Sequence, residues 1–158
     1  MTTLMLVRHG ETVDNANRIM QGQTQGQLNE TGIRQAEEVA ISLAGEHVDA
    51  VVSSDLKRSY DTACIIANKH GLDVSTTKLL RERDWGSFTG RYIPDLKEEK
   101  WPDDIESLDH LLYRAKIFLD FVRSEYPDHS VVAVGHGIIN KAIQAVYYKV
   151  TMSEVRPM

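Results

Sequence analysis

Apolar runs alternate along this chain with longer stretches in which apolar residues recur at helical spacing. The runs cover residues 4–7, 48–53, 74–80 and 131–134. They are short, and those at 4–7 and 131–134 are continuous, whereas 48–53 and 74–80 contain polar residues. Parallel strands that are covered on both faces have this kind of continuous apolar sequence. We therefore predict four strands, of which those at 4–7 and 131–134 should be buried.

The stretches between the runs predict helices. Asn29 can cap a helix that begins near Glu30 and ends at Gly45. A second helix should begin after a cap at Ser54 or Asp55 and end at Gly71. A long helix should begin at Asp103 or Asp104 and end before Pro127, and the last should run through residues 138–146. The expected apolar stripes are Ile33, Ala36, Ala40 and Leu43 in the first helix, Leu56, Tyr60, Ala63 and Ala67 in the second, and Ile105, Leu108, Leu112, Ala115, Leu119, Val122 and Tyr126 in the third.

Strands that alternate with helices predict an α/β fold in three layers, α/β/α, with a mostly parallel sheet flanked by helices on both faces. A length of 158 residues suits a single domain. Residues 8–28 are polar and rich in Gly and Gln, so we expect a functional loop there.

Composition and charge argue against several classes of function. The formal net charge of −5 argues against nucleic acid as a partner, because such proteins usually have a basic face. No apolar run approaches the roughly 20 residues that span a bilayer, and residues 1–4 do not resemble a signal peptide. Cys64 is the only cysteine, which excludes an internal disulfide. We expect a cytoplasmic protein with no membrane partner.

Two glycine-flanked histidines follow two of the predicted strands. Arg8-His9-Gly10 ends the first, and Gly135-His136-Gly137 ends the last. Ligand sites in open α/β sheets lie outside the carboxyl ends of the strands. Arg58, in the first turns of a helix, and Glu82, after the third strand, should reach the same edge. A lone histidine is more often structural, but the combined set favours a catalytic pocket.

These residue types suit phosphoryl transfer. Arginine forks bind phosphate oxygens through charge-assisted hydrogen bonds. A neutral imidazole can attack phosphorus and form a covalent phosphohistidine. A carboxylic acid can protonate the leaving oxygen and later, as a carboxylate, activate water. Arginines and a second histidine can neutralise the transferring group, so the set needs no metal.

At these positions the chain resembles the histidine phosphatase superfamily, in its phosphoglycerate-mutase-like branch, over residues 4 to about 146. The resemblance implies the fold of that branch, with a short cap insertion at about residues 87–110 of a single domain at 1–158. The matching positions are residues 8–12, Asn15, Arg18, Gln21 and Gly22, residues 28–32, Gln35 and Ala36, residues 53–58, Thr62 and Ala63, residues 80–82, Gly86, Gly90 and residues 135–137.

The resemblance also implies roles. His9 would be the nucleophile that becomes phosphorylated, and Glu82 would be the proton donor and later the base. Arg8, Arg58 and His136 would hold the phosphoryl oxygens, with Asn15 near the phosphate. The substrate would be a small phosphomonoester, hydrolysed without metal or other cofactor.

The chain departs from the family pattern in several places, among them Thr89, which replaces the usual acidic residue before Gly90. Lys141 stands where an arginine is common; we expect it outside the pocket, with a small effect. Relatives usually add a further strand after the final helix. Without it an exposed sheet edge could favour an oligomer.

Other functions fit the same residues. A phosphoglycerate-type mutase would return the phosphoryl group to its product. A phosphohistidine protein phosphatase would act on a phosphoprotein, and a phospholigand-binding module would not catalyse at all. Glu82, in a charged loop, could also be a surface ion-pair partner.

Overall fold

The computed structural model describes residues 1–156 and contains, within that range, one sheet of four strands. Every strand pair in it is parallel. The strands are β1 (Thr3–Arg8), β2 (Ala50–Ser54), β3 (Val74–Thr77) and β4 (Ser130–Gly135), in the order β1-β4-β2-β3. The prediction of a parallel α/β fold is confirmed.

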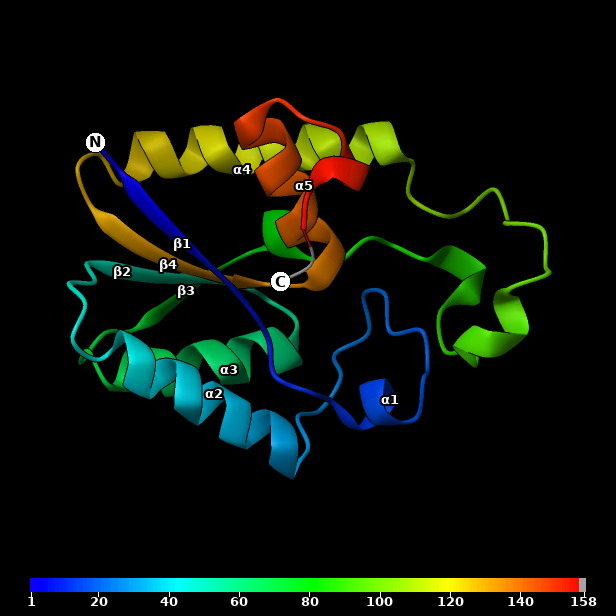
Figure 1. Cartoon of the computed structure of the whole chain (residues 1–158), viewed down its shortest axis with the longest axis horizontal. Helices are drawn as coiled ribbons and strands as arrows, with labels where there is room; N and C mark the ends of the chain where they lie inside the picture. The colour runs from blue at the N-terminus through cyan, green and yellow to red at the C-terminus, as the bar shows by residue number, and fades with distance from the viewer. Residues whose placement is uncertain (157–158) are drawn as a thin grey trace.

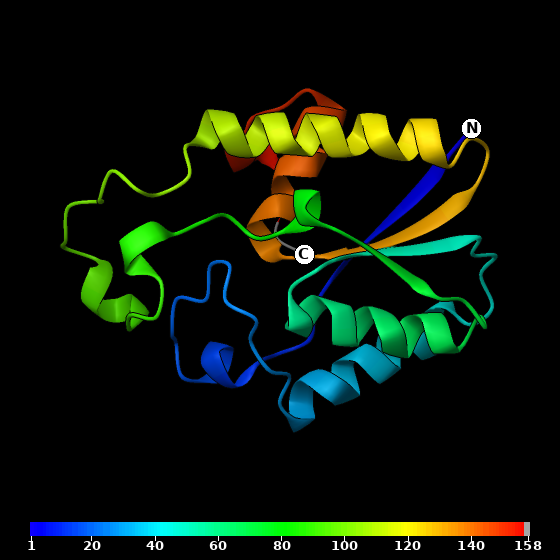
Figure 2. The ribbon, with the colours of Figure 1, turned by 180° about the vertical axis from the view of Figure 1, so that it is seen from behind.

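Helices cover both faces of the sheet. Figures 1 and 2 show α2 (Glu30–Leu43) and α3 (Lys57–Asn68) on one side, and α4 (Leu108–Glu125) and α5 (Gly137–Tyr148) on the other. Short helical segments lie in the connections: α1 (Val13–Ala16) and 3-10 turns at Lys78–Leu80, Gly86–Phe88, Ile93–Leu96 and Met152–Glu154. The molecule therefore has the three layers that the alternating pattern predicts.

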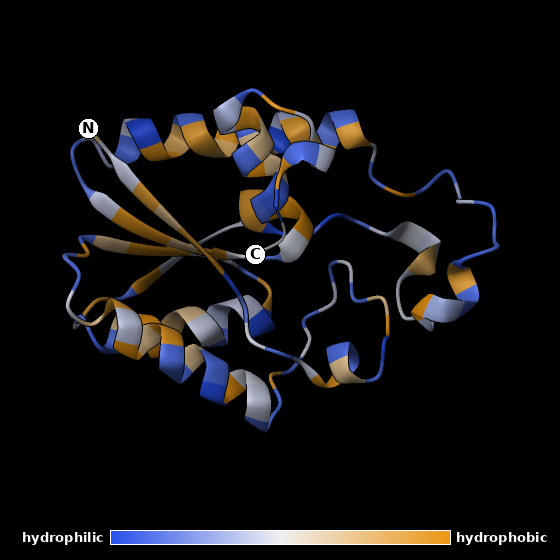
Figure 3. Ribbon diagram, in the orientation of Figure 1, coloured by the Kyte–Doolittle hydropathy of each residue, from blue (hydrophilic) through white to orange (hydrophobic). Residues whose placement is uncertain are grey.

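Strand β4 forms the centre of the core. Val131 and Ala133 pack with α4 and α5, whereas Val132 and Val134 pack with α2 and α3. All four side chains are fully buried, and burying a valine stabilises a fold by about 1.5–3 kcal/mol. Figure 3 shows the consequence, with apolar residues along β1, β2 and β4 and many polar residues on the helices.

The predicted start of α4 is wrong. The helix begins at Leu108, because Ser107 caps it by accepting a hydrogen bond from the His110 N–H. Asp104 instead accepts hydrogen bonds from the backbone and hydroxyl of Ser87, at 3.0 and 2.5 Å. The buried face is centred on residues such as Leu111 and Phe118, and Leu108 is 44% exposed.

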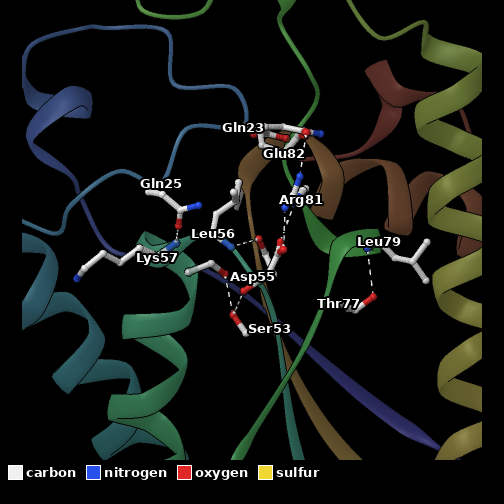
Figure 4. Close-up of polar contacts among 12 residues, drawn as sticks. Gln23, Gln25, Ser53, Asp55, Leu56, Lys57, Thr77, Leu79, Arg81 and Glu82 are labelled. Atoms are coloured by element: carbon white, nitrogen blue, oxygen red, sulfur yellow. Dashed lines mark hydrogen bonds and ion pairs between the residues drawn. The ribbon is translucent and has the colours of Figure 1, made fainter.

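Other boundaries also differ from the prediction, including that of β2, which begins at Ala50 rather than at residue 48. Strand β3 ends at Thr77, whose hydroxyl accepts from the Leu79 N–H and starts a 3-10 turn (Figure 4). Helix α3 begins at Lys57 without a side-chain cap, so neither Ser54 nor Asp55 has the predicted role.

Besides Leu108, two more residues assigned to apolar stripes are solvent-exposed. Ile33 is 42% exposed on α2 and Tyr60 is 40% exposed on α3. The buried faces of these helices are rotated and include Gly32 and Ile66 instead.

Candidate active site

The strand register brings the two glycine-flanked histidines together. Arg8 pairs with Gly135 across neighbouring strands, so His9 and His136 leave the sheet side by side. Their ring centroids are 5.0 Å apart and the planes meet at 64°. The juxtaposition follows from parallel pairing of the two apolar runs.

A cavity of about 380 Å³ opens at this end of the sheet. Of the residues proposed from sequence, Arg8, His9, Asn15, Arg58 and Glu82 line it. His136 is fully buried and packs edge-on against His9. The structure thus brings together residues from four separate segments of the chain around one space.

The imidazole of His9 is held in one tautomer. Its Nδ1 lies 2.6 Å from the carbonyl oxygen of Gly10. Because a carbonyl only accepts hydrogen bonds, Nδ1 carries the proton and Nε2 keeps its lone pair. Burial lowers the pKa of His9 to about 4, a drop that the hydrogen bond to Gly10 opposes and the charges of Arg58 and Arg8 increase. His9 is therefore neutral at neutral pH.

Gly10 is required by close backbone packing. A Cβ at this position would collide with the backbone of Gly32 at the start of α2. The Gly10 N–H donates to the hydroxyl of Thr62 on α3, at 3.2 Å. The residue after the histidine thus fixes β1 against two helices, and this locates His9.

Arg58 is a buried cation beside the histidines. It is 1% exposed and donates to the carbonyl oxygens of Thr24 and Gly22, the latter at 2.7 Å. Its Nε has no partner among the described residues. Burial lowers its pKa to about 10, against the opposing charges of Glu82 and Asp14, so it stays protonated at neutral pH.

Ser54 orients His136. The serine hydroxyl lies 2.9 Å from Nε2 of His136 and already accepts the Leu56 N–H. Which atom donates in this contact depends on the imidazole tautomer. The other ring nitrogen, Nδ1, is buried without a partner in the described residues. Burial first, then the charges of Arg58 and His9, hold the pKa of His136 well below its usual value.

Glu82 caps the N-terminus of helix α5, although it is distant from that helix in sequence. Its carboxylate accepts hydrogen bonds from the N–H groups of Ile138 and Ile139, at 3.1 and 3.0 Å, and from that of Arg83 at 2.9 Å. The α5 N-terminus has no side-chain cap of its own. Helix N-termini leave unpaired N–H groups and favour negative charge. Glu82 is thus fixed at the cavity by contacts that its sequence position does not reveal.

Asn15 has a local structural contact besides its place in the cavity wall. It forms a capping box with Thr12, in which its side chain accepts from the Thr12 N–H at 3.0 Å. The Thr12 hydroxyl in turn donates to Gln21, which is buried and also lines the cavity. The polar loop after β1 is therefore held by its own side chains.

The sequence did not predict two cationic side chains that line the cavity. Lys141 lines the cavity, so the expectation that it lies outside the pocket is wrong. Arg156 also lines it, because the segment after α5 returns to the start of that helix (Figure 1). Nothing in the local sequence around Arg156 indicates this position. Trp85, Ile19, Met20 and Ile93 add an apolar wall.

Two further features concern residues 1–156 as a whole. No three or more His, Cys, Asp or Glu side chains in this range are grouped so that they could hold a metal ion. No helix in the same range is long and apolar enough to cross a membrane.

Residues 4–158 match the histidine phosphatase superfamily, branch 1. The chain belongs to this family. Phosphoserine phosphatase 1 of Hydrogenobacter thermophilus is 33% identical over 169 residues, which cover 98% of this chain and 80% of that relative. A probable phosphoglycerate mutase, GpmB of Yersinia pestis, is 45% identical over 103 residues. That match covers 64% of this chain and 48% of the mutase, about half its length.

Solved structures of the family share the fold over nearly the whole chain. The mycobacterial glucosyl-3-phosphoglycerate phosphatase in complex with VO3 has a TM-score of 0.86 and 31% identity, covering 98% of this chain and 87% of that one. The phosphoserine phosphatase of Entamoeba histolytica in complex with 3-phosphoglyceric acid has a TM-score of 0.85 and 27% identity, covering 97% and 83%. YhfR of Bacillus stearothermophilus has a TM-score of 0.90 and 25% identity, covering 96% and 82%. The histidine phosphatase fold therefore extends across the described residues.

Proposed function

We propose that this chain is a phosphatase that hydrolyses small-molecule phosphomonoesters through a phosphohistidine on His9. One observation carries the proposal. The His9 imidazole is neutral, with Nδ1 tied to the Gly10 carbonyl and the lone pair on Nε2, and it lies in the wall of a cavity shared with Arg8 and Arg58. A fixed, unprotonated imidazole nitrogen among phosphate-binding groups suits nucleophilic attack on phosphorus.

In the first step, Nε2 of His9 forms a bond to phosphorus and the bond from phosphorus to the ester oxygen breaks. Glu82, protonated for this step, gives its proton to the departing oxygen so that it leaves as an alcohol. Arg8 and Arg58 neutralise the transferring phosphoryl oxygens, and His136, in the tautomer that carries its hydrogen on Nδ1, donates to one of them.

In the second step, a water molecule attacks phosphorus and the bond between phosphorus and Nε2 breaks. Glu82, now a carboxylate, accepts the proton of the water, and inorganic phosphate leaves. His9 returns to its neutral form. The positive charge of the arginines supplies the stabilisation that a metal ion gives in other phosphatases, so we propose a metal-independent reaction.

The substrate class follows from the walls of the cavity. Lys141 and Arg156 add positive charge beyond the two arginines of the phosphate site, and Trp85 and Ile93 add apolar surface. A volume of about 380 Å³ suits a small molecule. The names of the relatives, phosphoserine phosphatase and glucosyl-3-phosphoglycerate phosphatase, support small phosphorylated substrates.

A mutase is the second candidate, because the 45% identity to the probable phosphoglycerate mutase includes much of this chain. A mutase would return the phosphoryl group from His9 to another oxygen of the product. Hydrolysis releases inorganic phosphate instead. Assaying both products from one phosphoglycerate incubation separates the two activities.

The test is release of inorganic phosphate from a panel of phosphomonoesters, with and without a chelator. We expect the wild type to be active in both conditions and His9→Ala to be inactive. His129→Ala is the matched control, since it removes an exposed histidine that does not line the cavity. Ordinary turnover by His9→Ala would refute the covalent mechanism, and complete inhibition by the chelator would refute metal independence.

A further inference from the structure

A largely buried ion pair lies beside the Glu82 loop, outside the cavity wall. Arg114, on α4, is 11% exposed, and Glu106, just before that helix, is 5% exposed. The guanidinium donates to both carboxylate oxygens, at 2.8 and 2.9 Å. Isolated buried ion pairs contribute little to stability because desolvation opposes them. A contribution to stability therefore does not explain why this pair is buried here.

The remaining hydrogens of Arg114 bind the backbone at Glu82 and just before it. One terminal nitrogen donates to the carbonyl oxygens of Leu79 and Arg81, at 2.9 and 2.8 Å. The other donates to the carbonyl of Glu82 itself, at 3.4 Å. One side chain thus holds three carbonyl groups of the segment that carries the proposed proton donor.

Glu106 holds the other end of the same loop. Its carboxylate accepts from the Asp84 N–H at 3.1 Å, and its own N–H donates to the Asp84 carbonyl at 2.8 Å. Its carbonyl accepts from Nε of Arg83, at 2.8 Å. Residues 79–84 are therefore attached to the start of α4 on both sides of Glu82.

A second set of contacts holds the loop from the opposite side (Figure 4). Arg81 makes a two-pronged pair with Asp55 at the end of β2, with both distances 2.7 Å. The side chain of Gln23 donates to the carbonyl of Glu82 at 3.2 Å. The backbone of Glu82 has little freedom to move, although its side chain is only half-buried.

We propose that Arg114 and Glu106 are positioning residues that set the reach of the Glu82 carboxyl group toward the leaving oxygen. The inference rests on the proposed function, because it requires Glu82 to act as proton donor. Neither side chain lines the cavity, so both act through the Glu82 backbone. A general acid must come within hydrogen-bond distance of the leaving oxygen. Displacing it by 1 Å can reduce the rate by about 10²-fold.

The test uses two substrates of similar shape. Phenyl phosphate has a poor leaving group, whereas 4-nitrophenyl phosphate has a good one that needs little proton donation. Arg114→Lys keeps the charge but loses the planar fork. We expect this variant to lower kcat/KM on phenyl phosphate by roughly 10- to 100-fold and on 4-nitrophenyl phosphate by a few-fold at most.

Lys116→Gln is the control, since Lys116 lies on the same helix in an exposed ion pair with Asp120. It should leave both rates unchanged. Glu106→Gln, which keeps the shape of the side chain, is a second variant in case Arg114→Lys folds poorly. Glu106→Gln should likewise lower kcat/KM more on phenyl phosphate than on 4-nitrophenyl phosphate.

A double variant separates positioning from general damage. In a Glu82→Gln background, Arg114→Lys should cause no further loss that depends on the leaving group. The proposal would be overturned if Arg114→Lys lowered kcat/KM equally on both substrates. It would also be overturned if Arg114→Lys caused the same leaving-group-dependent loss in the Glu82→Gln background. If Glu82→Gln alone reduced both rates equally, Glu82 would not be the proton donor and this inference would fail. His9-dependent phosphate release, and with it the proposed phosphatase, would stand.

Discussion

Acidification from pH 7 to pH 5 should destabilise the fold through His9. Burial lowers the pKa of this imidazole to about 4, from a value of about 6.5 when it is exposed. Between these values the unfolded chain binds a proton that the folded chain does not, so stability falls as the pH falls. One pKa unit corresponds to about 1.4 kcal/mol, and at pH 5 the contribution lost through His9 is about 2 kcal/mol.

Urea unfolding at the two pH values measures this loss. Tryptophan fluorescence can report it, because Trp85 and Trp101 contact each other edge to face, with ring centroids 5.2 Å apart. We expect the wild type to lose about 2 kcal/mol more than His9→Gln between pH 7 and pH 5. His136 remains in both proteins, so its contribution largely cancels.

The comparison controls for the cavity that substitution leaves. Lost packing in His9→Gln lowers the free energy of unfolding at both pH values, so it does not change the difference between pH 7 and pH 5. His129→Gln, which removes an exposed histidine, should follow the wild type. Parallel pH dependence in the wild type and His9→Gln would refute the claim that His9 is held neutral by burial.

Three further outcomes follow from the site. Arg58→Lys loses the fork that binds the carbonyls of Gly22 and Thr24, and should raise the inhibition constant of inorganic phosphate by about 10- to 100-fold, measured in steady-state assays. Ser54→Ala removes the partner of His136 Nε2 and should lower kcat by about 10-fold, with urea unfolding as the fold control. The acid limb of kcat/KM for 4-nitrophenyl phosphate should lie near pH 4, since protonation of His9 removes the lone pair; a limb near pH 6.5 would contradict this.

The sequence was informative wherever local pattern and sheet geometry agree. Continuous apolar runs predicted β1 and β4, and the ends of these strands predicted that His9 and His136 would meet. The pairing of Arg8 with Gly135 places these residues side by side. The same reasoning predicted the position of Arg58, because the first turn of a helix that follows a parallel strand lies at the carboxyl edge of the sheet.

Features that depend on long-range contacts could not be read from the sequence. Glu82 caps α5, which begins more than fifty residues later, through backbone groups that carry no sequence signal. Lys141 and Arg156 reach the cavity because of where α5 and the following segment pack. The start of α4 was misplaced for a similar reason, since Asp104 resembles a cap but binds Ser87 instead.

The most direct test of the account is the site of phosphorylation. Wild-type protein is mixed with 4-nitrophenyl phosphate, quenched rapidly at alkaline pH and digested for mass spectrometry. We expect one phosphate on His9 during turnover, none after the substrate is exhausted, and none at any time in His9→Ala. Turnover with no phosphate on His9, or with phosphate on another residue, would contradict the phosphohistidine mechanism.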